Sequence, residues 1–202
     1  LIKLKLAKNA ISLFNEKGYE DVSVDEITSS FNKTRTFFYH YFKSKEDLFI
    51  YYSEIEKENF ERILKDIEKE FIGEPQKRLR KMLVDKMTLI YYSECYRVAV
   101  KNNLFEKIDR IGTLLKEFDQ TLISMYMDII DEGVRLGMFI PYEDMQAFLQ
   151  FYQKMQKGIE PTFVGEENED AFLYKYSTVV DLSIKAISKS NPNTMGLLDD
   201  LN

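Results

Sequence analysis

The feature that most constrains the fold of this chain is a pair of short helix signals separated by a tight turn near the N-terminus. Ser23 and Glu26 have the Ser-x-x-Glu spacing of a capping box, in which each side chain accepts a hydrogen bond from the other residue's backbone amide. Asn32 then suits a turn because asparagine tolerates a positive φ, and Thr34 can cap a second helix. The sequence therefore predicts the helix-turn-helix layout.

A basic, aromatic run covers the predicted turn and the second short helix. Residues 31–45, FNKTRTFFYHYFKSK, contain four basic side chains and no acidic ones, with aromatic side chains between them. The whole chain has a formal net charge of −6, whereas residues 1–50 carry eight Lys and Arg against seven Asp and Glu. A basic segment on an acidic protein indicates a polyanionic partner. Charge alone leaves open the alternative that this is an ordinary solvated helix face.

Helix breakers are rare in the rest of the chain. Four prolines and eight glycines occur in 202 residues, and apolar side chains recur at helical spacing almost throughout. The breaks expected near residues 73–75, 112 and 158–161 divide the chain into helical segments. We predict an all-α fold with helices at 1–17, 23–30, 35–41, 46–71, 76–101, 104–111, 113–136, 143–157 and 169–189.

Two segments of the first 50 residues fall into one register with a known pattern. These are LFNEKGYEDVSVDEI and FFYHYFKSKEDLF. They resemble the N-terminal DNA-binding domain of the tetracycline-repressor (TetR) family of bacterial transcriptional regulators, over about a quarter of the chain. The resemblance implies an all-helical homodimer that binds palindromic operators in double-stranded DNA. It further implies a ligand-controlled regulator, most often a repressor, that releases its operator when a small effector binds.

The resemblance places the DNA contacts at the turn and the second short helix. Lys33 and Arg35 lie at the start of that helix, so we expect them to meet base edges or nearby phosphates. Phe37 stands where the family usually has a phosphate-binding threonine, which leaves the operator sequence open. His40 either faces DNA or packs as a structural histidine. The predicted DNA-binding residues are Lys33, Thr34, Arg35, Thr36, Phe37, Tyr39, His40, Lys43 and Lys45.

The chain is predicted to divide at residue 45. Residues 1–45 form a three-helix DNA-binding domain, and residues 46–202 form a helical effector-binding and dimerisation domain. Tyrosine and methionine are frequent in the second part; most of them are explained by core packing, but they also make adaptable apolar pocket walls. Because fixed charges are few there, we expect a small, largely apolar or aromatic effector. The predicted lining residues are Met87, Tyr91, Cys95, Met125, Tyr126 and Tyr152.

Two helices near the C-terminus are predicted to form the dimer surface. A symmetric dimer would hold two recognition helices roughly 34–36 Å apart, one turn of DNA. The alternative is that the apolar stripes of these helices only cover the core of their own subunit. The stripes consist of Met145, Phe148, Leu149, Tyr152, Phe172, Tyr176, Val179, Val180 and Ile187.

Other chemistry is sparse in this sequence. One histidine and one cysteine do not make a His-rich metal site or a Cys/His nucleophile pair, so we expect no metal, no cofactor and no enzyme activity. The single Cys95 suits a reducing cytoplasm, and no apolar run approaches the length of a membrane span. Two alternatives stay open: a regulator of the same fold that has lost DNA binding and acts through protein partners, and a helical enzyme.

Overall fold

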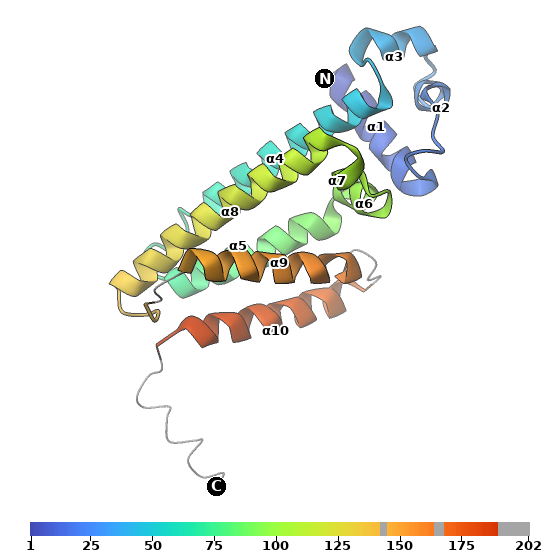
Figure 1. The fold of residues 1–202 in the computed structure, drawn as a ribbon. Coiled ribbons are helices and arrows are strands. Elements are labelled where there is room, and N and C mark those ends of the chain that lie inside the picture. Colours follow the sequence, from blue (N-terminus) through green and yellow to red (C-terminus); the bar gives the residue numbers. More distant parts are fainter. Residues whose placement is uncertain (142–144, 164–167, 190–202) are drawn as a thin grey trace.

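The computed structural model describes residues 1–141, 145–163 and 168–189. Within these ranges the fold is all-α, as predicted, with a small helical head at one end and a longer helical body (Figure 1). The α-helices are α1 Ile2–Lys17, α2 Val24–Ser29, α3 Arg35–Tyr41, α4 Lys45–Ile67, α5 Pro75–Tyr92, α6 Glu94–Lys101, α7 Leu104–Lys107, α8 Asp109–Arg135, α9 Met145–Phe163 and α10 Glu169–Ile187.

The helix-turn-helix is built by the local signals expected from the sequence. The amide of Ser23 donates to the Glu26 carboxylate at 2.9 Å, and the Ser23 hydroxyl accepts from the Glu26 amide at 3.2 Å, which confirms the capping box. Asn32 has φ 51°, as its place in the turn requires. Thr34 is the N-cap residue of α3, although its side chain makes no capping hydrogen bond.

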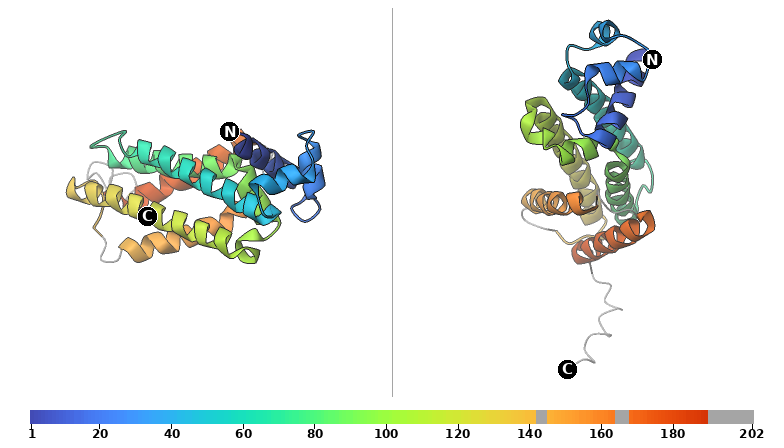
Figure 2. Two further views of the ribbon diagram at one scale, coloured as in Figure 1. Left: turned by 90° about the horizontal axis from the view of Figure 1, so that it is seen from above. Right: turned by 90° about the vertical axis from the view of Figure 1, so that its right-hand side faces the viewer.

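Two hydrophobic clusters hold the chain together, and they do not divide at residue 45. The first, which we call the head core, joins α1, α2, α3 and the start of α4 to α6, α7 and the start of α8. Aromatic rings fill its centre, with the ring centroids of Phe14 and Tyr19 5.0 Å apart. The second, the body core, is built from α4, α5, α8, α9 and α10. Figure 2 shows α6 and α7 lying beside the head from a second direction.

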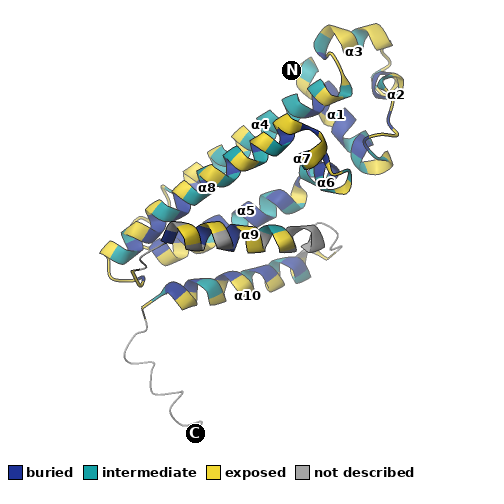
Figure 3. Cartoon of the chain, in the orientation of Figure 1, coloured by how far each residue is buried: buried dark blue, intermediate teal, exposed yellow. Residues whose placement is uncertain are grey.

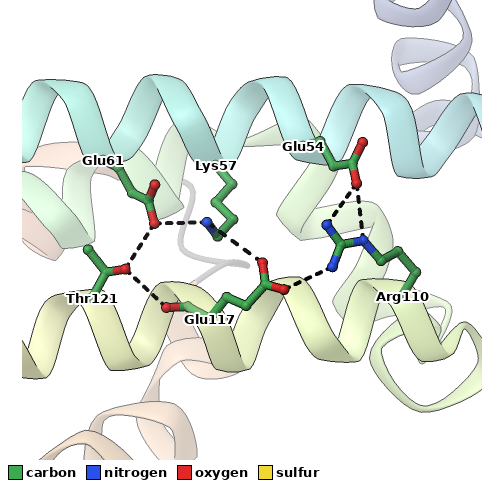
Figure 4. A network of polar contacts seen from close by, with 6 residues as sticks. All are labelled: Glu54, Lys57, Glu61, Arg110, Glu117 and Thr121. Carbon is green, nitrogen blue, oxygen red and sulfur yellow. Dashed lines mark hydrogen bonds and ion pairs between the residues drawn. The ribbon is translucent and has the colours of Figure 1, made fainter.

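Helices α4 and α8 pack lengthwise against each other, and a polar network follows their seam (Figure 4). Arg110 on α8 donates to Glu54 on α4 at 2.9 Å and to Glu117 at 2.9 Å. Lys57 on α4 pairs with Glu61 at 2.9 Å. The seam therefore combines an apolar interior with ion pairs at its solvent edge.

One predicted helix, 76–101, is two helices in the structure. The chain breaks at Ser93, which has ψ 106° and serves as N-cap of α6 by accepting from the amide of Tyr96 at 2.8 Å. The Ser93 hydroxyl also donates to Glu56 on α4 at 2.6 Å. The uninterrupted helix was a wrong prediction because the apolar pattern continues through this corner.

Three other predicted boundaries also move. Helix α4 ends at Ile67 instead of residue 71. Gly112 lies inside α8, where an added Cβ would come within 2.5 Å of the Phe105 carbonyl oxygen, so this glycine permits a close approach instead of ending a helix. Helix α9 continues through Gly158 and Pro161 to Phe163. A single glycine costs a helix only about 1 kcal/mol, which packing can override.

The apolar stripes predicted to form the dimer surface mostly face the chain's own core. Met145, Leu149 and Tyr152 are buried in the body core, and so are most stripe residues of α10. Only Val179 of the predicted set is exposed, at 45%, while the side chain of Phe148 lies outside the described part. Figure 3 shows buried and exposed residues alternating along α10. The prediction for the buried members was wrong because an apolar stripe does not reveal which of two surfaces it covers.

Candidate nucleic-acid interface and cavity

Helix α3 is anchored by two phenylalanines and presents its other side chains to solvent. Phe38 and Phe42 are 0% and 2% exposed in the head core, as their i, i+4 spacing predicts. Most of the predicted DNA-binding side chains lie on the outer side of this anchor. The exposed ones are Lys33, Thr34, Arg35, Thr36, Tyr39, His40 and Lys43.

Arg35 is held in place by two neighbours. Its guanidinium lies 3.2 Å from the carboxylate of Asp25 on α2 and donates to the Tyr39 hydroxyl at 3.3 Å. The guanidinium also lies over the Tyr39 ring, 5.7 Å from its centroid. These contacts orient a planar donor fork at the N-terminal end of α3, the geometry that suits bidentate contact with guanine or phosphate.

The aromatic side chains of α3 have different surroundings. Phe37 is partly buried; its ring lies 5.2 Å from that of Tyr41 and 5.6 Å from the Lys33 ammonium. His40 is exposed, and its ring lies 4.8 Å from that of Tyr41. The packed structural role considered for His40 therefore does not hold, whereas Phe37 supports the helix from within.

Lys45 has a role that the sequence did not reveal. Its ammonium donates to the carbonyl oxygens of Tyr19 and Val22, each at 2.8 Å, and to that of Glu20 at 3.3 Å. It also lies 5.0 Å from the centroid of the Tyr19 ring. The side chain thus fastens the loop between α1 and α2 to the start of α4, instead of projecting toward a phosphate as predicted.

A cavity of about 80 Å³ lies where the head core and the body core meet. Its walls are mostly apolar, and they come from α4, α5, α6, α8, α9 and the α7 segment. The lining residues are Ser53, Glu56, Lys57, Phe60, Lys86, Ile90, Cys95, Tyr96, Ala99, Phe105, Ile111, Leu114, Leu115, Phe118, Asp119 and Lys157.

Glu56 is the lining residue whose chemistry is most altered by its surroundings. Burial in the wall, together with the nearby charge of Glu94, raises the pKa of Glu56 to about 7, against a lowering effect of the hydrogen bond from Ser93. Burial also raises the pKa of Cys95, whose sulfur lies 3.2 Å from the Ser53 hydroxyl. The high thiol pKa argues against a reactive thiolate at Cys95.

The structure separates the six residues predicted to line an effector pocket. Cys95 lines the cavity described above. Tyr126 and Tyr152 line a smaller cavity of about 30 Å³ in the body core. Met87, Tyr91 and Met125 line neither of these two cavities and pack within or against the body core. The cavity of about 80 Å³ lies closer to the head than the sequence predicted, and its walls carry more charged groups.

Comparison with known proteins identifies the head. Residues 6–52 match the family described as bacterial regulatory proteins, tetR family. The N-terminal domain belongs to the tetR family. The match covers the capping box, the asparagine turn and α3 of this tetR head, and it ends within α4.

Relatives extend the similarity beyond the tetR head. The chain is 28% identical to the transcriptional regulator AcrR of Shigella flexneri over 105 residues, 52% of this chain and 48% of AcrR. It is 38% identical to IcaR of Staphylococcus epidermidis, a negative transcriptional regulator of a biofilm operon, over 48 residues. The chain thus spans about half the length of AcrR and about a quarter of that of IcaR.

The whole fold resembles that of a tetR-family regulator of known structure. PfmR from Thermus thermophilus superposes with a TM-score of 0.72, covering 90% of this chain and 97% of PfmR at 17% identity. At 17% identity this similarity concerns the fold alone. The arrangement of a tetR head on a helical body is therefore shown for the described part of this chain.

Sequence reasoning missed two kinds of residue at these sites. In the sequence Asp25 indicates only a helix start, but in the structure its negative charge pairs with Arg35 and orients it. Glu56 gave no signal because a lone glutamate on a polar helix face is common. Among the described residues, no group of three or more His, Cys, Asp or Glu is arranged to hold a metal ion, and none of the helices is long and apolar enough to cross a membrane.

Proposed function

We propose that this chain is a DNA-binding transcriptional regulator that represses its target genes as a homodimer on a palindromic operator. The observation that carries the proposal is the exposed basic start of α3, where Arg35 is oriented by Asp25 and Tyr39. The tetR match over residues 6–52 supports DNA binding by this element. The negative regulator IcaR among the relatives supports repression.

The homodimer is proposed to form through α9 and α10, by exposed side chains of which only Val179 belongs to the predicted stripes. Large apolar side chains remain exposed on these helices after the chain's own core is complete. They are Met155, Tyr174, Val179 and Leu182, which are 46%, 74%, 45% and 63% exposed. Apolar side chains gathered on neighbouring helices favour a surface that is covered in an assembly.

The cavity between the two cores is proposed to hold the effector. Helix α6 gives Cys95, Tyr96 and Ala99 to the cavity wall and also contacts the head. The Ser12 hydroxyl of α1 donates to Glu94 at 2.7 Å. A ligand that displaces α6 would therefore move α1. It would shift the equilibrium between two spacings of the recognition helices, and the size of this shift is set by the difference between its affinities for the two arrangements.

Selection of binding sites from random double-stranded DNA, followed by gel-shift titration at several salt concentrations, tests the DNA-binding proposal. We expect Arg35→Ala to weaken binding by about tenfold or more and to relax preference at one base pair, because a bidentate base contact is lost. Arg62→Ala removes the same charge from an exposed site on α4 and is the matched control. Equal binding by parent, control and Arg35→Ala would contradict the proposal, and so would a failure to select any sequence.

Sedimentation tests the dimer proposal independently of DNA. The parent is expected to be a dimer at micromolar concentration, and Leu182→Glu is expected to shift it to monomer because a charge would enter an apolar interface. Lys185→Glu changes charge on the same helix and serves as the control. A parent that is monomeric, or a Leu182→Glu variant that dimerises as well as the parent, would contradict this interface.

A further inference from the structure

The cavity wall contains an acid whose negative charge has no cationic partner among the described residues. The carboxylate of Glu56 has one hydrogen bond, from the Ser93 hydroxyl at 2.6 Å. The charge of Glu94 on α6 is also negative, and its repulsion adds to the effect of burial on the pKa of Glu56. A carboxyl group in this position gains most from a ligand that brings a positive charge.

The lysines of the same wall are already engaged. Lys57 pairs with Glu61 at 2.9 Å and approaches Glu117 at 3.8 Å. Lys157 pairs with Asp119, and Lys86 also has an interaction partner. An anionic ligand would have to compete with these partners, whereas a cation beside Glu56 would not.

Aromatic rings complete the environment that a cation needs. At the end of the cavity formed by α6 and α7, the ring centroids of Tyr96 and Phe105 are 5.4 Å apart. Between α4 and α8, the ring centroids of Phe60 and Phe118 are 6.3 Å apart. Aromatic faces attract ammonium groups, and the attraction grows when water is excluded. The wall therefore offers a carboxylate, several rings and otherwise mainly apolar surface.

We propose that this cavity binds a small lipophilic cation, an amine or quaternary ammonium with one ring or a short hydrocarbon body, through Glu56 and the surrounding rings. The inference rests on the proposed function in taking the cavity as the effector site, and it adds a positive charge to the small, largely apolar or aromatic effector expected from the sequence. The cavity of about 80 Å³ is smaller than the engineered cavity of about 150 Å³ that holds benzene. A one-ring ligand must therefore widen it, which supplies the displacement of α6.

Calorimetric titration with three one-ring probes tests the proposal: benzylammonium, benzyl alcohol and benzoate. The parent is expected to bind benzylammonium most tightly and benzoate most weakly. Raising the pH from 6 to 8 should tighten benzylammonium binding by about tenfold, because the ionised fraction of a carboxyl group with a pKa of about 7 rises by that factor while the probe stays protonated. The other charged or titratable groups that line the cavity are Lys57, Lys86, Cys95, Tyr96, Asp119 and Lys157, and Tyr52 and Glu94 also interact electrostatically with Glu56.

The Glu56→Gln variant separates Glu56 from those other groups. It keeps the side-chain shape, so benzyl alcohol should bind as it does to the parent. Benzylammonium should bind this variant at least about tenfold more weakly than it binds the parent at pH 8, and its affinity should no longer depend on pH. Glu54→Gln changes the same residue type on the same helix, outside the cavity wall, and should leave both properties unchanged.

Two outcomes of the probe titrations would count against the proposal. Benzoate binding as tightly as benzylammonium would show that the lysines dominate, and a failure of all three probes to bind would show that the cavity takes no one-ring ligand. Operator binding is measured separately on the same samples. Cation binding by a protein that selects no DNA would contradict the proposed function and leave this inference standing, whereas DNA binding that ignores a bound cation would remove only its role as effector.

Discussion

The centre of the head and the boundary between the two cores are packed in different ways. In the head, the rings of Phe14, Tyr19 and Phe49 contact one another, and Phe14 is 1% exposed. At the boundary, Phe118 faces a cavity, and an acid with a raised pKa lies in the same wall. A close-packed region holds one shape, while a region with space and unbalanced charge can adopt two. If the cavity holds the effector as proposed, this difference would separate a rigid DNA-binding head from a region that changes shape when the ligand binds.

The largest expected effect compares one phenylalanine from each region. Phe14→Ala should lower the free energy of unfolding by about 3–5 kcal/mol, because it opens a void in a filled core. Phe118→Ala should lower the free energy of unfolding by about 1 kcal/mol less than Phe14→Ala does, because Phe118 borders a cavity and gives up fewer packing contacts. Denaturant titration of both variants measures the difference. Equal losses would show that the two regions are packed alike.

Lys45→Met tests how the head is fastened. Removing a charged donor from three backbone carbonyls should lower the free energy of unfolding by about 1.5–3 kcal/mol. The salt dependence of DNA binding by the folded variant should stay near that of the parent. Lys43→Met, at an exposed neighbouring position, should do the reverse, with little loss of stability and a salt slope reduced by about one. If instead Lys45→Met reduces the salt slope and Lys43→Met lowers the free energy of unfolding, the predicted phosphate contact of Lys45 would be supported.

The pH dependence of stability tests the boundary region. The folded-state pKa of Glu56 lies above its ordinary value of 4.5, so the folded state binds this proton more tightly than the unfolded state does. Its contribution to stability is therefore full below about pH 4.5 and is lost as pH rises toward and through 7. The loss should be on the order of 1–2 kcal/mol, allowing for partial exposure. Parent and Glu56→Gln should diverge over this window in urea titrations, and parallel pH profiles would contradict the assignment.

The smallest effect is expected at the solvent edge of the α4–α8 seam (Figure 4). Arg110 bridges Glu54 and Glu117, yet all three side chains are about two-fifths exposed. Exposed ion pairs contribute little and are screened by salt. Arg110→Ala should therefore change stability only slightly at low salt and not at all at high salt. A large, salt-independent loss would mean that this network holds the boundary closed.

The head could be predicted from the sequence because its signals are local. Ser23 and Glu26 bond each other's backbone amides, and Asn32 adopts the positive φ of the turn. Thr34 is the N-cap of α3, and the bounds of α3 match the prediction. The cavity could not be predicted in the same way. Tyrosines such as Tyr91 were chosen by residue type, but helix crossings decide whether a ring packs or faces a space. The raised pKa of Glu56 likewise depends on contacts between segments that are distant in the sequence.

The sharing of α6 between the two cores bears on whether the DNA-reading part can be exchanged between regulators. Val98 and Leu104 are buried in the head core although they follow the tetR match by some fifty residues, and Tyr19 donates its amide to Asn102 at 3.2 Å. In a chimera joined at residue 45 or 52, the head would pack against another protein's residues in place of α6 and α7. Residues 94–114 would have to travel with the head for its interior to remain complete. In this chain, specificity for DNA and sensitivity to ligand would therefore be inherited together.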